Sequence, residues 1–237
     1  MTCCINMKYY ELRKVQKPKD DTSAYHLPSF LREKIGNNKN LKVLDIGCGF
    51  GRMLFALRNE GFTCLRGIDS STEAIDYCKQ HNLSVGLSDL KEFLAENKEK
   101  FDLIITNHVI EHIKKDEIIN ILKNIRESLS DNGSFFITVP NAQSSTGCYW
   151  AYEDFTHETL FTGGSLYFAL KASNFSEVDF LDIDCTFGLS KLKKFKRKLL
   201  LKIYRHFLNL IHEATGSSYH QPSPEIFSFE IKALAKK

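Results

Sequence analysis

The chain has 237 residues, 43% hydrophobic and 26% charged, which is enough for one ordinary globular core and short for two. Its formal net charge of +3 is too small to indicate a nucleic-acid partner. Eight basic residues and no acidic one fall within residues 191–205, so the rest carries 24 basic residues against 29 acidic ones. We therefore expect a single domain, 1–237, that is mildly acidic apart from one basic segment.

The seven cysteines are scattered and include no CxxC pair, a pattern that favours reduced thiols over a zinc site or a disulfide framework. The first residues, MTCCINMKYYELRK, lack the apolar core of a signal peptide. No stretch approaches the ~18 apolar residues of a membrane span. We expect a cytoplasmic protein that is neither secreted nor inserted in a bilayer.

The lead-in, 1–40, contains one predicted helix at 25–35. From 41 to 140, short apolar runs alternate with helical patterns, which is typical of a parallel α/β sheet. Asp-Asn-Gly at 131–133 predicts the end of the last of these helices. The predicted strands are 42–46, 63–68, 83–86, 101–106 and 134–139, and the predicted helices are 51–59, 72–80, 89–97 and 116–129. This alternation predicts a doubly wound sheet.

Residues 141–162 show little periodicity but are rich in polar and aromatic side chains, so we expect a functional loop. A helix at 164–173, a strand at 178–187 and a final strand at 226–235 follow. The basic segment is therefore predicted to be an insertion between the last two strands.

The strongest motif is a glycine-rich turn after the first strand, with Gly47, Gly49 and Gly51 in GxGxG spacing. The next strand ends at Asp69, 18 residues after Gly51 and close to the ~20 expected for a carboxylate that binds a ribose diol. The spacing differs from the GxGxxG of a dinucleotide site, which disfavours a dehydrogenase. Two alternatives stay open: a bare strand-to-helix turn, and Asp69 as a helix cap.

On these motifs the chain resembles the class I methyltransferases that depend on S-adenosylmethionine. LDIGCGFGR resembles the first motif of that family, GIDSS the second, Ser88-Asp89-Leu90 the third and FDLIITNHVIEHI the fourth. The resemblance implies a Rossmann-like, mostly parallel seven-stranded sheet whose last two strands form a reversed hairpin, with a helical insertion before the last strand. It also implies a cofactor-binding core at 41–140 and acceptor-side elements at 141–237.

The same resemblance implies the residues that bind S-adenosylmethionine. Asp69 would bind the ribose, and Asp45 would meet the methionine amino group or, alternatively, brace the turn. The expected cofactor-binding residues are Asp45, Gly47, Cys48, Gly49, Gly51, Asp69, Ser70, Asp89, Leu90 and Asn107.

The segments VPNAQSS and DFTHETLFTGGSLYFALKASNF resemble a subgroup that methylates surface glycans and small molecules. This implies O-methylation of a sugar, sugar nucleotide or phosphorylated small molecule in surface polysaccharide biosynthesis. Methyl transfer to a hydroxyl requires removal of its proton, for which histidine is a suitable base. His157 in the polar loop is the first catalytic candidate and His108 the second. Alternatively, His157 is a loop residue hydrogen-bonded to Asp154 or Glu158.

His108, Glu111 and His112 have the spacing to face one point on a helical turn. The cluster resembles the metal-binding motif of methyltransferases of quinone biosynthesis and of RNA 3′ ends, where the first position is usually glutamate; His157 would be the fourth ligand. Three imidazoles and one carboxylate suit manganese, zinc or iron better than magnesium. The alternatives are therefore a metal-dependent methyltransferase acting on RNA 3′ ends or a quinone-type phenol, and a Glu-His pair that only braces the cofactor loop.

Apolar residues recur at steps of three and four within and beyond the basic segment, which predicts an amphipathic helix at 191–212 with a cationic face. The cationic face would be solvated, attract an anionic small-molecule or glycan acceptor, or contact the inner face of a membrane. The apolar residues are Leu192, Phe195, Leu199, Ile203, Phe207 and Leu210.

Overall fold

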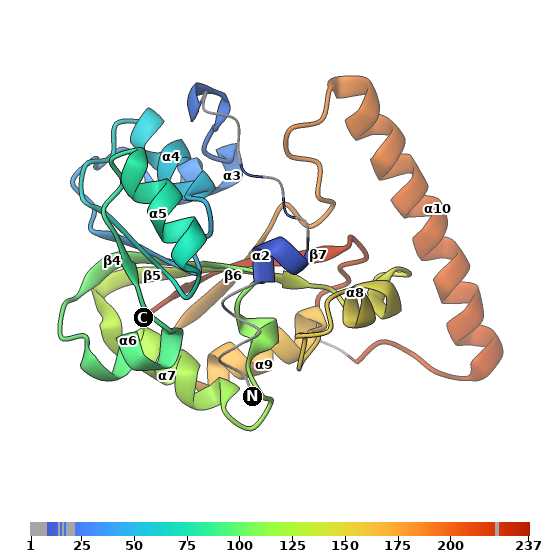
Figure 1. Ribbon diagram of the computed structural model, residues 1–237. Helices are drawn as coiled ribbons and strands as arrows, with labels where there is room; N and C mark the ends of the chain where they lie inside the picture. Colours follow the sequence, from blue (N-terminus) through green and yellow to red (C-terminus); the bar gives the residue numbers. More distant parts are fainter. Residues whose placement is uncertain (1–8, 14, 16, 18–21, 221–222) are drawn as a thin grey trace.

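The computed structural model describes residues 9–13, 15, 17, 22–220 and 223–237 (Figure 1). Most of the first segment, MTCCINMKYYELRK, lies outside the described residues, and so do its cysteines Cys3 and Cys4. The other five cysteines are free thiols.

A seven-stranded sheet in the order β3-β2-β1-β4-β5-β7-β6 forms the centre of the molecule. β7 pairs antiparallel with both β5 and β6, and the other pairs are parallel. This topology confirms the expected Rossmann-like, mostly parallel sheet with a reversed hairpin at its end. The strands are β1 (Val43–Ile46), β2 (Leu65–Asp69), β3 (Val85–Leu87), β4 (Phe101–Asn107), β5 (Leu129–Pro140), β6 (Glu177–Leu181) and β7 (Glu230–Lys236).

Helices cover both faces of the sheet. In Figure 1, α3, α4 and α5 lie on one face, and α6, α7 and α9 lie on the other. Helices α6, α7 and α9 contribute apolar side chains to one buried cluster, and α3, α4 and α5 contribute to two others, so the sheet is shielded from water on both sides. The helices are α2 (Tyr9–Leu12), α3 (Ser29–Ile35), α4 (Arg52–Asn59), α5 (Thr72–Gln80), α6 (Leu90–Glu96), α7 (Ile118–Ser128), α8 (Gly147–Glu153), α9 (Gly163–Ala172) and α10 (Lys191–Thr215), with short 3-10 turns η1 (Thr22–Ala24) and η2 (Ile110–His112).

Several predicted boundaries were wrong. The helix predicted at 25–35 begins only at Ser29, because Pro28 precedes it in an extended conformation. The helix predicted at 116–129 spans Ile118–Ser128, and the residues of its predicted stop signal, 131–133, belong to β5, where its register with β4 shifts. The strand predicted at 178–187 ends at Leu181, because Asp182 adopts a φ of 41° and its carboxylate accepts the backbone N–H of Thr186.

Two further differences concern the C-terminal half. The loop predicted at 141–162 contains the short helix α8, whose Gly147 packs closely on the Ala142 backbone. The last strand starts at Glu230 rather than at 226. The 226–229 segment is held by a side chain instead, because the Asn141 amide donates to the carbonyls of Ile226 and Ser228, both at 2.7 Å.

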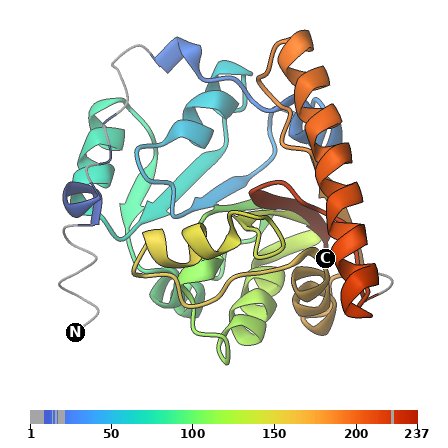
Figure 2. The same cartoon turned by 90° about the vertical axis from the view of Figure 1, so that its right-hand side faces the viewer.

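The basic segment forms α10, a straight helix of 25 residues that lies along one edge of the molecule (Figures 1 and 2). This confirms the predicted insertion between the last two strands. None of its residues is buried. No helix within the described residues is long and apolar enough to cross a membrane.

Candidate functional site

The glycine-rich turn connects β1 to α4 in a conformation that glycine adopts readily. Gly47, Gly49 and Gly51 all have positive φ, between 51° and 76°. A Cβ at Gly47 would lie 2.4 Å from Val109 Cγ2, so the turn approaches the end of β4 too closely for a side chain. The Gly49 N–H donates to Asp69 Oδ2 at 2.8 Å, which ties the turn to the end of β2.

Asp69 is almost fully buried and shapes two turns. Besides the Gly49 bond, its Oδ1 accepts the Ser71 N–H at 2.8 Å, and the Tyr10 hydroxyl donates to Oδ2 at 3.4 Å. The N-cap of α5 is Ser71, whose hydroxyl accepts the Ala74 N–H. The alternative that Asp69 itself caps this helix is therefore wrong.

Asp45 lies inside β1, next to the turn, and is buried. Burial and the nearby charge of Asp69 raise its pKa to about 8, so the carboxyl is mostly protonated at neutral pH. A cationic group placed beside it would favour its ionised form.

The other expected cofactor residues lie at the carboxyl ends of neighbouring strands, the edge at which α/β sheets bind ligands. Asp89 caps α6 by accepting the Lys91 N–H at 2.8 Å, with the buried Leu90 beside it. Asn107 ends β4 and accepts the Thr138 hydroxyl at 2.9 Å. Ser70 is exposed, whereas the Cys48 side chain packs inward among apolar residues and leaves only its backbone on the turn.

Helix α2 bridges the two sides of this edge, a contact that no pattern in the sequence indicates. Tyr10 lies over the glycine turn, with its ring 4.9 Å from that of Phe50. Its neighbour Tyr9 donates a 2.5 Å hydrogen bond to Asp154 in the loop after β5. The lead-in segment therefore contacts both Asp69 and the loop expected to bind the acceptor.

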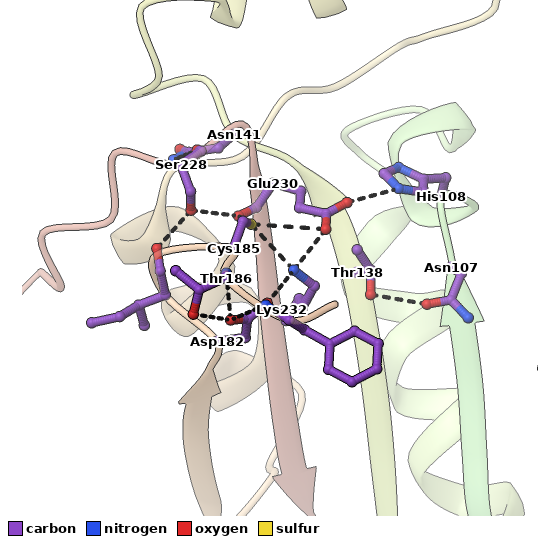
Figure 3. Close-up of polar contacts among 12 residues, drawn as sticks. Asn107, His108, Thr138, Asn141, Asp182, Cys185, Thr186, Ser228, Glu230 and Lys232 are labelled. Atoms are coloured by element: carbon purple, nitrogen blue, oxygen red, sulfur yellow. Dashed lines mark hydrogen bonds and ion pairs between the residues drawn. The ribbon is translucent and has the colours of Figure 1, made fainter. Parts of the chain in front are cut away.

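His108 follows β4 with a φ of 55°, an uncommon conformation for a residue other than glycine. Its Nδ1 lies 3.1 Å from Glu111 Oε1. Its Nε2 lies 3.3 Å from Glu230 Oε2 (Figure 3). Burial lowers the pKa of the imidazole, but the hydrogen bonds and charges of the two carboxylates outweigh this effect and raise it to about 9. His108 is thus a cation at neutral pH and poorly suited to be the catalytic base that was expected.

The pairing continues along β7. Lys232 Nζ lies 2.6 Å from Glu230 Oε1, 3.2 Å from Asp182 Oδ2 and 3.2 Å from Cys185 Sγ (Figure 3). The result is a row of alternating charges from Glu111 to Asp182, hereafter the charge row. Its β7 members were not predicted from the sequence. The available signal was two charged residues, at 230 and 232, on one face of a predicted strand.

Three of the four metal candidates do come together: the ligand atoms of Glu111, His112 and His157 lie within 4.8 Å of one another. His108 is not a member, because η2 is a tight 3-10 turn and both nitrogens of His108 face carboxylates. The expected convergence of His108, Glu111 and His112 on one point was therefore wrong.

Hydrogen bonds orient both remaining imidazoles. His157 Nδ1 lies 2.7 Å from the Trp150 carbonyl. The alternative partner Asp154 is bonded through the backbone, because its carbonyl accepts the His157 N–H at 3.1 Å. His112 Nδ1 contacts the carbonyl and the hydroxyl of Thr156. Because a carbonyl only accepts, each Nδ1 carries a proton, and in the neutral imidazole Nε2 is then the nitrogen with a lone pair.

This arrangement fits a divalent cation. Glu111 is fully buried, and its Oε2 has no hydrogen-bond partner within the described residues. A buried carboxylate oxygen without a partner is costly unless a proton or a cation compensates it. Two imidazole Nε2 atoms and one carboxylate oxygen suit zinc, manganese or iron.

A cavity of about 450 Å³ lies between α10 and the segment that leads into β7. Lys193, Lys196 and Arg197 give its wall a positive charge. The ring of Phe229, which lines it, packs 5.9 Å from the ring of Trp150, the residue that orients His157. Apolar residues complete the lining, among them Leu189, Leu200, Leu201, Tyr204 and Phe227.

Known proteins with similar sequences include methyltransferases. A family model described as a methyltransferase domain matches residues 19–179. The ubiquinone biosynthesis O-methyltransferase of Bartonella tribocorum is 35% identical over 108 residues, 43% of this chain and 42% of that protein. The (S)-coclaurine N-methyltransferase of Papaver somniferum is 36% identical over 101 residues, 40% of this chain and 28% of that protein. The chain thus spans half or less of the length of these relatives.

Solved structures share the fold. A SAM dependent methyltransferase from Archaeoglobus fulgidus superposes with a TM-score of 0.65 at 20% identity, covering 97% of this chain and 98% of that one. One from Mesorhizobium loti gives 0.58 at 14% identity, covering 87% and 95%.

The buried carboxyl of Asp45 predicts a pH-dependent stability. Its pKa, raised from 3.8 to about 8, makes the folded state bind an extra proton between these values, so this contribution to stability falls as pH rises from 4 through 8. Asp45→Asn removes the titration. We expect the free energy of unfolding of this variant to exceed that of the native protein at both pH values, with a difference that is larger at pH 9 than at pH 5 by about 4 kcal/mol. Urea unfolding at both pH values measures this, with the exposed Asp116→Asn as control; a constant difference would contradict it.

The imidazolium of His108 predicts the opposite dependence. A pKa raised from 6.5 to about 9 adds stability that is complete below pH 6.5 and is lost as pH rises through 9. We expect His108→Gln to lower the free energy of unfolding by about 1 kcal/mol at pH 6.5, a modest value because the side chain is 45% exposed. Urea unfolding should show the two proteins converging near pH 10. A difference that grows with pH would show that His108 is neutral.

Proposed function

The chain belongs to the methyltransferase-domain family, and on this premise we propose that it transfers a methyl group from S-adenosylmethionine to a hydroxyl oxygen of a small acceptor, with a divalent cation held by Glu111, His112 and His157. The observation that carries this proposal is the buried Glu111 carboxylate, which clusters with His112 and His157 and whose Oε2 has no hydrogen-bond partner among the described residues.

The cofactor end is supported by the glycine turn and the two buried aspartates. Positive φ values at the turn leave its backbone open to close approach, and Asp69 is positioned to accept a ribose hydroxyl. Asp45, with its pKa near 8, would lose its proton beside the methionine ammonium. When bound, S-adenosylmethionine supplies a methyl group on a positively charged sulfur, so the protein has chiefly to align the acceptor oxygen behind that methyl.

The acceptor oxygen must also lose its proton. A divalent cation, when bound, favours the deprotonated form of a neighbouring hydroxyl. The role of the chain is to hold the donors in place. Protonated His108 orients Glu111 through Oε1, while Trp150 and Thr156 fix the imidazoles of His157 and His112. If no cation takes part, the free Nε2 of His157 is the proposed base.

Two acceptor classes remain as candidates. A phenolic hydroxyl is favoured, because O-methylation is named for the Bartonella tribocorum relative and the metal donors suit phenol activation. A sugar, sugar nucleotide or phosphorylated small molecule in surface polysaccharide assembly is the second candidate. Its support is the positive wall of the cavity, formed by Lys193, Lys196 and Arg197.

Transfer of an isotope-labelled methyl group from S-adenosylmethionine into a panel of catechols, sugar nucleotides, phosphorylated metabolites and RNA 3′ ends tests the proposal. Labelled catechol methyl ether would support the first class, and a labelled sugar nucleotide or phosphate ester would support the second. Tight binding of the cofactor without transfer to any member would contradict both and favour a binding module.

The proposed metal site predicts that activity depends on Glu111. We expect Glu111→Gln to lower kcat by about 100-fold or more and to weaken metal binding, because a charged donor is replaced by an amide. Activity assays after chelation and metal re-addition, with metal content of the purified protein, measure both effects. The exposed neighbour Glu158→Gln serves as the control. Full activity of the chelated native protein would rule out a metal role.

His157 gives a prediction that holds for either role. His157→Ala should lower kcat by about 100-fold, as expected for loss of a base or ligand, with little change in the Kd for S-adenosylmethionine. Single-turnover assays and cofactor titration separate the two quantities. Native turnover in this variant would exclude His157 from the chemistry. In the metal-free case, the chelator-resistant activity should still be lost on this substitution.

A further inference from the structure

Helix α10 contacts the rest of the molecule along one side only. The Arg197 guanidinium donates to the Cys185 carbonyl, and the Tyr204 ring lies 5.8 Å from that of Phe227. The partly exposed residues of the helix, among them Leu201 and Leu208, lie on this same side. The opposite side faces solvent along the edge of the molecule (Figure 2).

That opposite side carries a continuous line of large apolar residues. Over the five steps from Leu192 to Leu210, the mean spacing is that of an α-helix, 3.6 residues, so the line runs straight along the axis instead of drifting around it. At 100° per residue it projects away from Arg197 and Tyr204. We name it the outer stripe. It consists of Leu192 (78% exposed), Phe195 (68%), Leu199 (48%), Ile203 (57%), Phe207 (58%) and Leu210 (49%).

Positive charges border the outer stripe. With the 100° rotation per residue of an α-helix, one border of the outer stripe carries Lys191, Lys194, Lys198 and Lys202. The other border carries Lys196. All five are exposed. Within the described residues, Arg205 is the one cation of α10 that forms an ion pair, with Glu225. The helix contains one acidic residue, Glu213.

We propose that α10 binds parallel to the surface of an anionic phospholipid bilayer, with the outer stripe in the interface and the bordering lysines among the lipid headgroups. An apolar line with a row of lysines along one border and a further lysine on the other fits a helix that lies in the plane of a membrane. At 1.5 Å per residue the outer stripe extends about 27 Å along the helix, from Leu192 to Leu210. The contact is peripheral, since α10 does not have the apolar length of a membrane span.

The charges of α10 favour an anionic bilayer as its partner over a second copy of α10 or a nucleic acid. Two copies of α10 packed through their outer stripes would bring two cationic borders together, with one glutamate in each helix to offset them. A nucleic acid would satisfy the lysines but leave the outer stripe in water. An anionic bilayer satisfies both features. Because α10 also walls the cavity, this orientation would bring the cavity close to the headgroups.

Flotation of the full chain with vesicles tests the proposal. We expect the protein to float with vesicles of phosphatidylcholine containing 30% phosphatidylglycerol, and not with pure phosphatidylcholine. Raising the salt from 0.1 to 0.5 M should weaken the partition at least fivefold, because the headgroup contacts are screened.

Two variants separate charge from apolar contact, and both retain the cavity residues. Vesicle binding should fall at least tenfold in the first variant, which changes Lys191, Lys194, Lys198 and Lys202 together to Gln. The control changes four exposed lysines elsewhere to Gln and should bind as the native chain does. The control lysines are Lys79, Lys98, Lys115 and Lys123.

The apolar contribution has a closely matched control. Phe195→Gln removes a phenylalanine of the outer stripe that is 68% exposed, and Phe168→Gln removes one on α9 that is 70% exposed. We expect binding to fall several-fold in the first variant only. Circular dichroism checks that both keep their helices.

The proposal would be overturned if the protein floated with neither vesicle or equally with both. It would also be overturned if Phe195→Gln and Phe168→Gln lost vesicle binding equally. A protein that does not bind lipid but forms a dimer that Phe195→Gln dissociates would contradict it as well. Salt-sensitive binding of RNA without vesicle binding would equally reject it. None of these depends on methyl transfer.

Discussion

The charge row that runs from Glu111 through His108, Glu230 and Lys232 to Asp182 is the interaction on which the candidate site depends. Each member lies beside at least one group of opposite charge, so a set of ionised side chains is accommodated close to the apolar core. Removing one member would leave its neighbours charged, poorly hydrated and unpaired, which costs more than the pair itself contributes. The row joins the end of β4 to the start of β7 and the end of β6, the strands that face the expected acceptor side.

This row also explains the state of Glu111. One carboxylate oxygen is bound by His108, whose position between two carboxylates keeps it protonated. The other oxygen is buried and has no hydrogen-bond partner in the part of the chain that the structure describes, and the carboxylate clusters with His112 and His157. The same glutamate therefore belongs to a structural network and to a cluster of potential ligands. A histidine that holds a proton tightly is a good orienting group and a poor base. His157 is therefore a better candidate base than His108.

Segments far apart in the chain supply the remaining constraints. Tyr10 contacts Asp69 at the cofactor end, and Tyr9 contacts Asp154 in the loop after β5. Asp154 accepts the Thr156 hydroxyl, which in turn contacts His112. Burial raises the pKa of Asp154, but the hydrogen bonds to its carboxylate outweigh this and hold the pKa at about 2. The hydrogen bonds from His112 through Thr156 therefore end at a negatively charged carboxylate. The two halves of the site are connected through α2, whereas α10 contributes a wall of the cavity and a separate outer surface.

The sequence by itself determined the sheet, the glycine turn, Asp69 at the end of the second strand and the amphipathic insertion, because each depends on local periodicity or on spacing between neighbouring elements. It missed Glu230 as the partner of His108, since β7 is 122 residues away and its antiparallel insertion is a property of the whole sheet. It placed His108 among the metal candidates by assuming a regular helical turn. Only the tertiary structure showed a positive φ and a 3-10 turn, which direct His108 to the carboxylates and leave Glu111 facing the other two histidines. Spacing along a chain limits which side chains can meet, but the directions in which they point depend on backbone torsions and on partners from distant strands.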